Sequence, residues 1–295
     1  MSDFRKGILF LFISVLLYSI MPVLIRMLGA GAIPPASQVF LRYIVAFMCA
    51  AAYFRLTRQK FSVKKKDLPF LAGIALVGYA LTNLFYTYGI LLTQVGTVLF
   101  IFYCFSIMTP ILAKIFLKER INTAKIIALV LGFAALVFLF RPGPVATWKL
   151  GALFAFASAI GQSVYIIGRK KLGSIHSATF LLANTFVGVI AVGLIAFITE
   201  AGFYTGPSGI QHVQPTTWLV TILFGIDNFA AWLFMTRGFQ LVAAGTGSLV
   251  MLAENLIGVA FAFLFFREIP SASTLTGGLL ILIASTLVIA KGEKA

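Results

Sequence analysis

The sequence predicts an all-α integral membrane protein whose ten transmembrane helices form two inverted five-helix repeats. Hydrophobic residues make up 61% of the 295 positions and charged residues only 11%, whereas soluble domains carry about 25% charged residues. Apolar stretches of about 20 residues, long enough to cross a bilayer as helices, recur along the chain. Parts of the first half also reappear in the second half at nearly constant offsets.

The apolar stretches define ten spans, and the short connections between them leave no room for a separate soluble domain. The first span resembles a signal peptide because Arg5 and Lys6 precede it. Its apolar stretch is too long for one and its sequence reappears later, so we expect it to be retained. The expected spans are 7–27, 37–55, 68–91, 95–117, 123–140, 150–170, 177–199, 215–239, 243–266 and 273–290.

The net charge of +15 would suit a nucleic-acid-binding protein, but the positions of the basic residues argue against that partner. With the N-terminus in the cytoplasm, most of the 23 Lys and Arg residues fall in cytoplasmic segments, as the positive-inside rule requires. We therefore expect a multi-pass protein of the bacterial inner (plasma) membrane with both termini cytoplasmic. The KKKD run at 64–67 is then a topology anchor, with a lipid-headgroup site as the lesser alternative.

The repeat is the main functional signal in the sequence. At an offset of 144, GILFLFISVLLYS at 7–19 matches GALFAFASAIGQS at 151–163; at an offset of 149, LTQVGT at 92–97 matches LVAAGT at 241–246. The second offset also aligns Glu119 with Glu268. Each repeat holds five spans. Because five is odd, the second repeat enters the membrane from the opposite side, as in many secondary transporters. We expect the repeats to be 1–143 and 144–295.

The ends of the fourth and ninth spans read FLKERI at 116–121 and FFREIP at 265–270. With ten spans in a five-plus-five repeat, the chain resembles EamA-type transporters of the drug/metabolite transporter superfamily. That resemblance implies export or import of small metabolites such as amino acids, their derivatives or nucleotide-like compounds. The resemblance indicates the fold but does not identify the substrate.

Two acidic residues lie deep within expected spans. Asp227 is 12 residues from Pro215 and from Phe239, roughly 18 Å from either end at 1.5 Å per residue, and Glu254 lies at a similar depth. A charge at the bilayer centre costs at least about 2.5–3.5 kcal/mol and usually faces the bundle interior or a wet cavity. Either acid could pair with Arg42 as a structural ion pair. Alternatively, one acid binds a substrate ammonium or carries a coupling proton, because burial favours a neutral carboxyl group and an arriving cation favours the charged form.

The repeat indicates which other residues line the centre. The offset of 149 aligns Tyr79 with Asn228 and Asn83 with Trp232. At these positions both repeats therefore carry a polar or aromatic residue. Each could instead join helices by one hydrogen bond, worth about 0.6–2 kcal/mol. As a set they predict a central polar cavity. The expected substrate-binding residues are Tyr18, Arg42, Tyr79, Asn83, Tyr86, Tyr103, Gln162, Asp227, Asn228, Trp232, Glu254 and Asn255.

These side chains favour an amine-bearing or zwitterionic cargo, such as an amino acid or derivative, moved by alternating access and optionally coupled to protons. The acids suit an amine, Arg42 suits a carboxylate, and the rings suit planar or cationic ligands. The alternatives are import or exchange of a nucleotide-like metabolite such as S-adenosylmethionine, and export of lipophilic cations. The direction of transport is not encoded in any pattern.

Other classes of function fit poorly. No H-E-x-x-H or G-x-S-x-G motif occurs, and no cysteine or histidine cluster suggests a metal site. We expect no enzyme activity, no cofactor and no metal. A channel would need polar residues along a whole pore, whereas here they gather near mid-depth. We expect a monomer, with a dimer as the alternative. Pro22 and Pro110 are the prolines well inside spans and should kink spans one and four.

Overall fold

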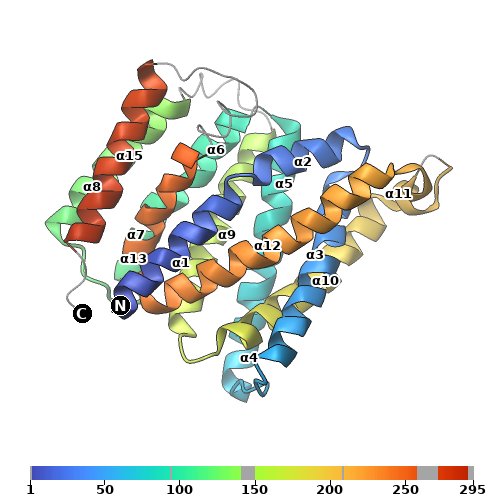
Figure 1. The fold of residues 1–295 in the computed structure, drawn as a ribbon, viewed down its shortest axis with the longest axis horizontal. Helices are drawn as coiled ribbons and strands as arrows, with labels where there is room; N and C mark the ends of the chain where they lie inside the picture. Colours follow the sequence, from blue (N-terminus) through green and yellow to red (C-terminus); the bar gives the residue numbers. More distant parts are fainter. Residues whose placement is uncertain (1, 94, 141–149, 208, 258–271, 292–295) are drawn as a thin grey trace.

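The computed structural model describes residues 2–93, 95–140, 150–207, 209–257 and 272–291. Within these ranges the regular structure is entirely helical, and the helices pack into one bundle (Figure 1). The α-helices are α1 (Asp3–Tyr18), α2 (Met21–Ala30), α3 (Pro35–Leu56), α4 (Leu68–Gly73), α5 (Thr82–Leu92), α6 (Val95–Tyr103), α7 (Phe105–Phe116), α8 (Thr123–Phe140), α9 (Leu150–Lys171), α10 (Ser177–Thr199), α11 (Ala201–Thr205), α12 (Pro215–Leu241), α13 (Ala244–Val250) and α15 (Ala272–Ala290). A π-helix at Ile74–Leu81 and short 3₁₀ turns at Lys65–Asp67, Ile210–His212 and Met251–Ala253 complete the described elements.

Seven helical segments in the described ranges are long and apolar enough to cross a membrane: Asp3–Ala30, Pro35–Leu56, Lys65–Leu92, Thr97–Phe116, Leu150–Lys171, Ser177–Thr199 and Pro215–Leu241. Two shorter apolar helices, Thr123–Phe138 and Leu275–Ala290, lie where the fifth and tenth spans were expected. The ninth expected span, 243–266, runs beyond the described residues after position 257. The helical membrane fold is therefore confirmed, while the number ten stays a prediction.

Several of the expected spans are interrupted and not continuous helices. The first span breaks between α1 and α2, because Pro22 has no N–H to donate to the carbonyl of Tyr18, four residues earlier. The third contains the eight-residue π-helix, and the ninth passes through the 3₁₀ turn after α13. Pro22 thus bends its span as expected.

The fourth span is interrupted at a different place from the one expected. The break falls at Cys104, between α6 and α7, and Pro110 lies inside α7. Because a proline at this position cannot donate to Ser106, the Ser106 carbonyl is left free of its helical bond. It accepts a hydrogen bond from the Ser248 hydroxyl at 3.4 Å instead. The helix therefore tolerates Pro110 by binding the neighbouring span.

The helices pack in pairs that are distant in sequence. Helix α1 runs beside α12, α3 beside α10, α7 beside α13 and α8 beside α15, while α9 packs against α5 and the π-helix (Figure 1). Glycines allow two of these crossings. A Cβ atom on Gly7 would lie 3.3 Å from the carbonyl oxygen of Gly238, and one on Gly89 would lie 3.3 Å from that of Gly151. Both pairs of backbones approach too closely for larger residues.

A serine joins the helices at each of the same two crossings. On α1, Ser14 donates to the Ala231 carbonyl of α12 at 2.9 Å. On α9, Ser158 donates to the Thr82 carbonyl of α5, also at 2.9 Å. The two crossings thus use the same residue types and the same contacts.

The distribution of polar and apolar side chains is that of a protein surrounded by lipid. Large apolar residues such as Leu153, Leu194 and Ile198 lie on the outside with 60–79% of their surface exposed. A water-soluble monomer rarely exposes such extended apolar surface. The interior in turn holds many buried polar side chains, among them Arg42, Asn83, Gln162 and Glu254. The site is built from these interior groups.

Candidate functional site

A small cavity of about 20 Å³ lies inside the bundle, between α1, α2, α5, α6, α9 and α12 and the residue that follows the 3₁₀ turn at 251–253. A cavity needs roughly 10–15 Å³ to hold one water molecule, so this one has room for about a single water. Six of its ten lining residues were expected from the sequence. They are Tyr18, Asn83, Tyr86, Gln162, Trp232 and Glu254.

The interruptions of the helices place side chains around this cavity. Tyr18 is the last residue of α1, Tyr103 is the last residue of α6, and Glu254 directly follows the 3₁₀ turn. Broken helices free backbone groups and bring side chains from their ends to a common point, as in many transporters. The chain therefore concentrates its expected site residues where its helices are irregular.

Glu254 supplies the acidic group of the cavity. Its side chain is 6% exposed, and its carboxyl group interacts with the Tyr103 hydroxyl and lies near Tyr86 and Tyr18. No cation forms an ion pair with Glu254 among the described residues. A buried carboxyl group facing a cavity with aromatic hydroxyl groups as neighbours can accept a proton or bind an ammonium group.

Trp232 is the centre of an aromatic cluster that forms one wall. Its ring centroid lies 4.4 Å from that of Tyr165, 4.6 Å from that of Tyr79 and 6.0 Å from that of Tyr18, in each case edge to face. Edge-to-face packing of this kind fixes ring orientation and contributes about 0.5–1.5 kcal/mol per pair beyond burial. The indole is thus held rigidly against the cavity.

The π-helix positions Tyr79 beneath this cluster. The Tyr79 hydroxyl donates to Asn228 Oδ1 at 3.2 Å, and its backbone carbonyl accepts from the Tyr43 hydroxyl at 2.9 Å and from the Asn83 amide at 3.0 Å. The same carbonyl also accepts the backbone N–H of Thr82 at the end of the π-helix, and π-helical turns are frequent at functional sites.

Arg42 on α3 is fully buried beside the cavity wall. One Nη atom donates to Asn83 Oδ1 at 3.1 Å, and the guanidinium carbon lies 4.5 Å from the ring centroid of Phe224. The structural ion pair considered from the sequence is absent, because neither Asp227 nor Glu254 lies within 4 Å of Arg42. The guanidinium is hydrogen-bonded to the neutral groups of Asn83 and Thr87, and its charge interacts at longer range with Asp227.

Several buried donors near the cavity find no hydrogen-bond partner among the described residues. They are the Tyr18 hydroxyl, the Trp232 indole N–H, the Asn228 amide nitrogen and the Nε and second Nη atoms of Arg42. An unpaired buried donor costs about 1–3 kcal/mol. Tyr18 and Trp232 line the cavity and the other two residues lie beside it, so these donors are placed where they could bind an acceptor group.

Six of the twelve residues expected at the site do not line the cavity. Arg42, Tyr79 and Tyr103 contact residues of the lining and Asn228 bonds to Tyr79, whereas Asp227 and Asn255 lie away from it. Asp227 is only half-buried, and the structure shows no hydrogen bond or ion pair of its side chain among the described residues. Asn255 is buried, but its amide group donates to the Leu252 carbonyl of the preceding turn. The physical reason is helical geometry, because consecutive residues point about 100° apart. Asn228 and Glu254 face inward, so their neighbours Asp227 and Asn255 do not.

Four lining residues were not expected from the sequence. Met21, Thr82 and Phe102 carry no charge; the offset of 149 pairs Thr82 with Ala231 and Phe102 with Met251, and only Met21 has an aromatic counterpart, Tyr165, at the offset of 144. Their sequence signal is position alone: Met21 follows the first helix break and Phe102 precedes the break at Cys104. Ser158 completes the lining, on the helical face shared with Gln162.

A helical membrane bundle with a buried polar cavity at its helix breaks has the architecture of a membrane transporter. The chain belongs to the EamA-like transporter family, whose pattern matches residues 5–141 and again 149–290. The family and its named relatives are transporters, so this chain is a transporter and not an enzyme.

The relatives differ in what they carry. An S-adenosylmethionine uptake transporter of Rickettsia felis is 24% identical over 71% of this chain and 68% of its own length. A pseudopaline exporter of Pseudomonas aeruginosa, CntI, is 20% identical over 95% of this chain and 94% of its own. A crystal structure of a protein with 18% identity covers 96% of both chains at a TM-score of 0.77, which shows a common fold.

Proposed function

We propose that this protein is a secondary active transporter that moves a small zwitterionic or amine-bearing metabolite, such as an amino acid or a derivative, by alternating access. One observation carries the proposal: a buried acid and a set of unpartnered donors lie around the same central cavity. Glu254 provides negative charge, and Arg42 provides positive charge beside the cavity wall. A zwitterion has the complementary pair of groups.

The donors fit the carboxylate end of such a substrate. The Nε and Nη atoms of Arg42 suit planar carboxylates, and the Asn228 amide and Trp232 indole add neutral donors without a partner. The ammonium end would meet Glu254, with the rings of Trp232 and Tyr18 offering faces for a cation. Binding would thus give these buried groups hydrogen-bond partners.

A cavity of about 20 Å³ is far smaller than the roughly 300–1,000 Å³ of ordinary ligand pockets. The described conformation is therefore a closed one, and substrate must enter through another. The breaks between α1 and α2 and between α6 and α7 are points where half-helices can tilt. Their location at the cavity supports gating by the helices that bind the substrate.

The proposed mechanism needs two repeats, 1–143 and 144–295, of opposite orientation, and the paired contacts support them. Ser14 aligns with Ser158 at the offset of 144, and Thr82 aligns with Ala231 at the offset of 149. The hydrogen bond from Ser14 to Ala231 therefore has its counterpart in the bond from Ser158 to Thr82. The glycine crossings Gly7–Gly238 and Gly151–Gly89 follow the same rule. Contacts that exchange in this way are expected of two halves related by a two-fold axis.

The setting of the transporter follows from the sequence. We infer residence in the bacterial inner membrane, both termini in the cytoplasm and a monomer, with a dimer as the alternative. Proton coupling through Glu254 is part of the proposal, because the carboxyl group has no ion-pair partner among the described residues. It would exchange its proton for the substrate ammonium.

A second candidate substrate is a nucleotide-like metabolite such as S-adenosylmethionine. It is favoured by the Rickettsia relatives, which are uptake transporters for that compound, and by the aromatic wall around Trp232. S-adenosylmethionine also ends in an amino-acid group, so the same acid and donors would serve both candidates.

A ligand screen with the purified protein tests the proposal. A ligand that binds only the folded state raises its melting temperature. We expect amino acids or derivatives with free amino and carboxyl groups to raise it, and their N-acylated or esterified analogues to fail. Stabilisation by simple lipophilic cations alone would overturn the proposal. Uptake of each hit into proteoliposomes would then distinguish a transported substrate from a ligand that binds without being transported.

A further inference from the structure

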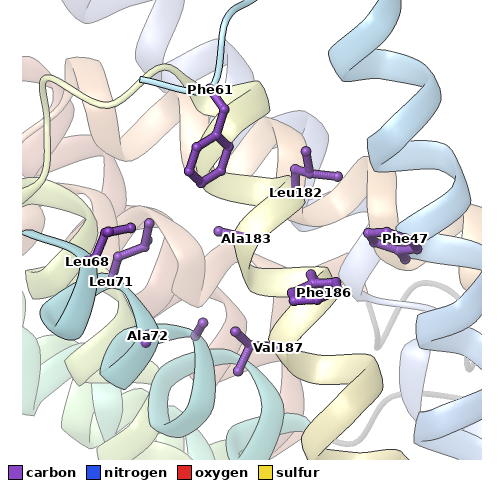
Figure 2. Close-up of a pocket in the computed structure, with 10 residues that line it drawn as sticks. Phe47, Phe61, Leu68, Leu71, Ala72, Leu182, Ala183, Phe186 and Val187 are labelled. Carbon is purple, nitrogen blue, oxygen red and sulfur yellow. The ribbon is translucent and has the colours of Figure 1, made fainter. Parts of the chain in front are cut away.

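A second cavity, separate from the central one, lies on the side of the bundle between α3, α4, the π-helix and α10 (Figure 2). Its volume is about 380 Å³, which is within the range of ordinary ligand pockets. Figure 2 shows Leu68 and Leu71 of α4 facing Ala183 and Phe186 of α10 across the space, with Phe61 above it. All ten lining side chains are apolar: Phe47, Phe61, Leu68, Leu71, Ala72, Ala75, Leu182, Ala183, Phe186 and Val187.

The walls of this side cavity suit a hydrocarbon chain and nothing polar. None of the ten lining side chains carries a hydrogen-bonding group, so a polar metabolite would lose its hydration without compensation. Phe61, Leu68 and Phe186 each remain more than 40% exposed although they line it. The cavity thus faces the outside of the bundle, which is the lipid.

The chain segment that contributes Phe61 and Leu68 to the side cavity is positively charged. The segment that connects α3 to α4 supplies Phe61 and Leu68 to the lining, and Lys64, Lys65 and Lys66 lie between them, all exposed. A further lysine, Lys171 of α9, lies 5.0 Å over the ring of Phe70 on α4. Asp67 is the one acidic residue in the connecting segment 57–67. An apolar slot next to a lysine-rich segment matches the two parts of an anionic phospholipid.

We propose that the side cavity binds one anionic phospholipid of the adjoining leaflet, with an acyl chain between α4 and α10 and the phosphate on Lys64, Lys65 and Lys66. Clustered lysines next to a membrane helix attract anionic headgroups, whereas a zwitterionic headgroup gains little from them. Phe61, three residues before Lys64, lies above the slot and would cover the chain (Figure 2).

The bound lipid would stiffen the wall of the transport site. Ala75 lines the side cavity and belongs to the same π-helix as Tyr79. On α10, Val187 lines it, and a Cβ atom on the next residue, Gly188, would lie 2.9 Å from the Tyr43 ring and 3.2 Å from the Tyr79 ring. The lipid therefore packs on the outer faces of the π-helix and α10. Tyr79 belongs to the π-helix, and Tyr43 of α3 packs against α10 at Gly188.

Native mass spectrometry of the purified full-length protein tests this site, with phosphatidylglycerol and phosphatidylcholine offered in turn. We expect one retained phosphatidylglycerol and much weaker retention of phosphatidylcholine. The triple variant Lys64→Gln/Lys65→Gln/Lys66→Gln should lose affinity about fivefold per lysine, on the order of a hundredfold in all. The matched triple variant Lys114→Gln/Lys118→Gln/Arg120→Gln removes the same charge elsewhere and should leave retention unchanged.

A second pair of variants tests the acyl-chain slot. Ala183→Phe fills the space between α4 and α10 and should weaken phosphatidylglycerol retention at least about tenfold. Ala52→Phe adds the same ring to an exposed position of α3 outside the lining and should have no effect. The proposal would be overturned by equal retention of both lipids or by unchanged retention in Ala183→Phe. A loss of retention in the control variant Lys114→Gln/Lys118→Gln/Arg120→Gln would also overturn it. Should Ala183→Phe fail to fold, the lysine variants and the comparison of lipids still decide.

Discussion

The hydroxyl group of Tyr79 donates a hydrogen bond to the side-chain carbonyl of Asn228 at 3.2 Å, and these residues are 149 positions apart, the offset that aligns the two halves of the sequence. A residue can touch its own counterpart only close to an axis that relates the halves. The pair therefore marks where such an axis would run. Trp232 and Asn83, a second pair with the same offset, both line the central cavity beside it.

Glu254→Gln should abolish or uncouple transport, because glutamine can neither carry the proton nor offer a charge to an ammonium group. A hydrogen bond to a charged group is worth about 1.5–3 kcal/mol, so we expect substrate affinity to fall about tenfold to a hundredfold. Binding is measured by thermal shift, and uptake in proteoliposomes over a range of pH. Wild-type uptake by the variant at every pH would contradict the role.

Asp227→Asn provides the matched comparison for Glu254→Gln. Asp227 also lies near the middle of its helix, but it is half-buried and outside the cavity lining. We expect a smaller loss of substrate affinity than in Glu254→Gln, because Asp227 lies outside the cavity lining and acts on the site only through its electrostatic interaction with Arg42. If this variant lost transport while Glu254→Gln kept it, the assignment of the two acids would have to be exchanged.

Trp232→Phe should weaken substrate binding more than it weakens the fold. Phenylalanine keeps an aromatic face among Tyr18, Tyr79 and Tyr165, but it lacks the indole N–H, which has no hydrogen-bond partner among the described residues. We expect a loss of about fivefold or more in affinity, in line with about 1 kcal/mol for a neutral hydrogen bond. Trp218→Phe, on the same helix but outside the lining, should bind normally. Equal affinities for the two variants would remove Trp232 from the site.

The sequence predicted the helical fold and several residues that line the cavity, but not the irregularities of the helices around it. Repeat offsets identified Tyr18, Asn83, Gln162 and Trp232 because polar residues at matched positions are unusual in apolar helices. The π-helix at Ile74–Leu81 and the break at Cys104 escaped prediction, since no proline or glycine pattern specifies them. They arise from tertiary contacts such as the Tyr43 hydroxyl on the Tyr79 carbonyl.

The choice between neighbouring residues was equally hidden in the sequence. Asp227 and Asn228 have similar polarity, and only the rotation of α12 against its neighbours decides which one faces inward. That rotation depends on packing around buried residues such as Phe224 and Trp232, which hydropathy does not reveal. Helix α12 is apolar on all sides, so it has no face that the sequence could identify.

Glu119→Gln should destabilise the protein without changing what it binds. The Glu119 carboxylate accepts the backbone N–H groups of Ala244 at 2.8 Å and Gly245 at 3.1 Å, at the start of α13. Removing the charge from such a cap costs about 1–2 kcal/mol, and each kcal/mol lowers Tm by about 2–4 °C in a chain of this order of size. Asp3→Asn removes an exposed ion pair with Lys6 and should leave Tm nearly unchanged. A normal Tm for Glu119→Gln would show that the neutral side chain caps as well.

Gly161→Ala should force α9 away from the π-helix. A Cβ atom at this position would lie 2.9 Å from the backbone carbonyl oxygen of Val77 and would also overlap the Thr82 hydroxyl. We expect a loss of about 1–3 kcal/mol from overpacking, seen as a lower Tm, together with reduced uptake because Thr82 lines the cavity. Gly73→Ala meets nothing within 4 Å and should be neutral or slightly stabilising. Equal behaviour of the two variants would show that the crossing is looser than the structure indicates.

Ser14→Ala and Ser158→Ala separate the role of the repeat from the role of the site. Each serine donates at 2.9 Å to a backbone carbonyl of the neighbouring helix. Each variant should therefore lose about 0.6–2 kcal/mol of stability, and the two losses should be similar. Only Ser158 lines the central cavity, so substrate affinity should change in Ser158→Ala and stay constant in Ser14→Ala. Thermal shifts with and without ligand give both quantities from one experiment. A large difference in stability between the two empty variants would count against equivalent crossings, whereas equal ligand effects would place Ser158 outside the binding site.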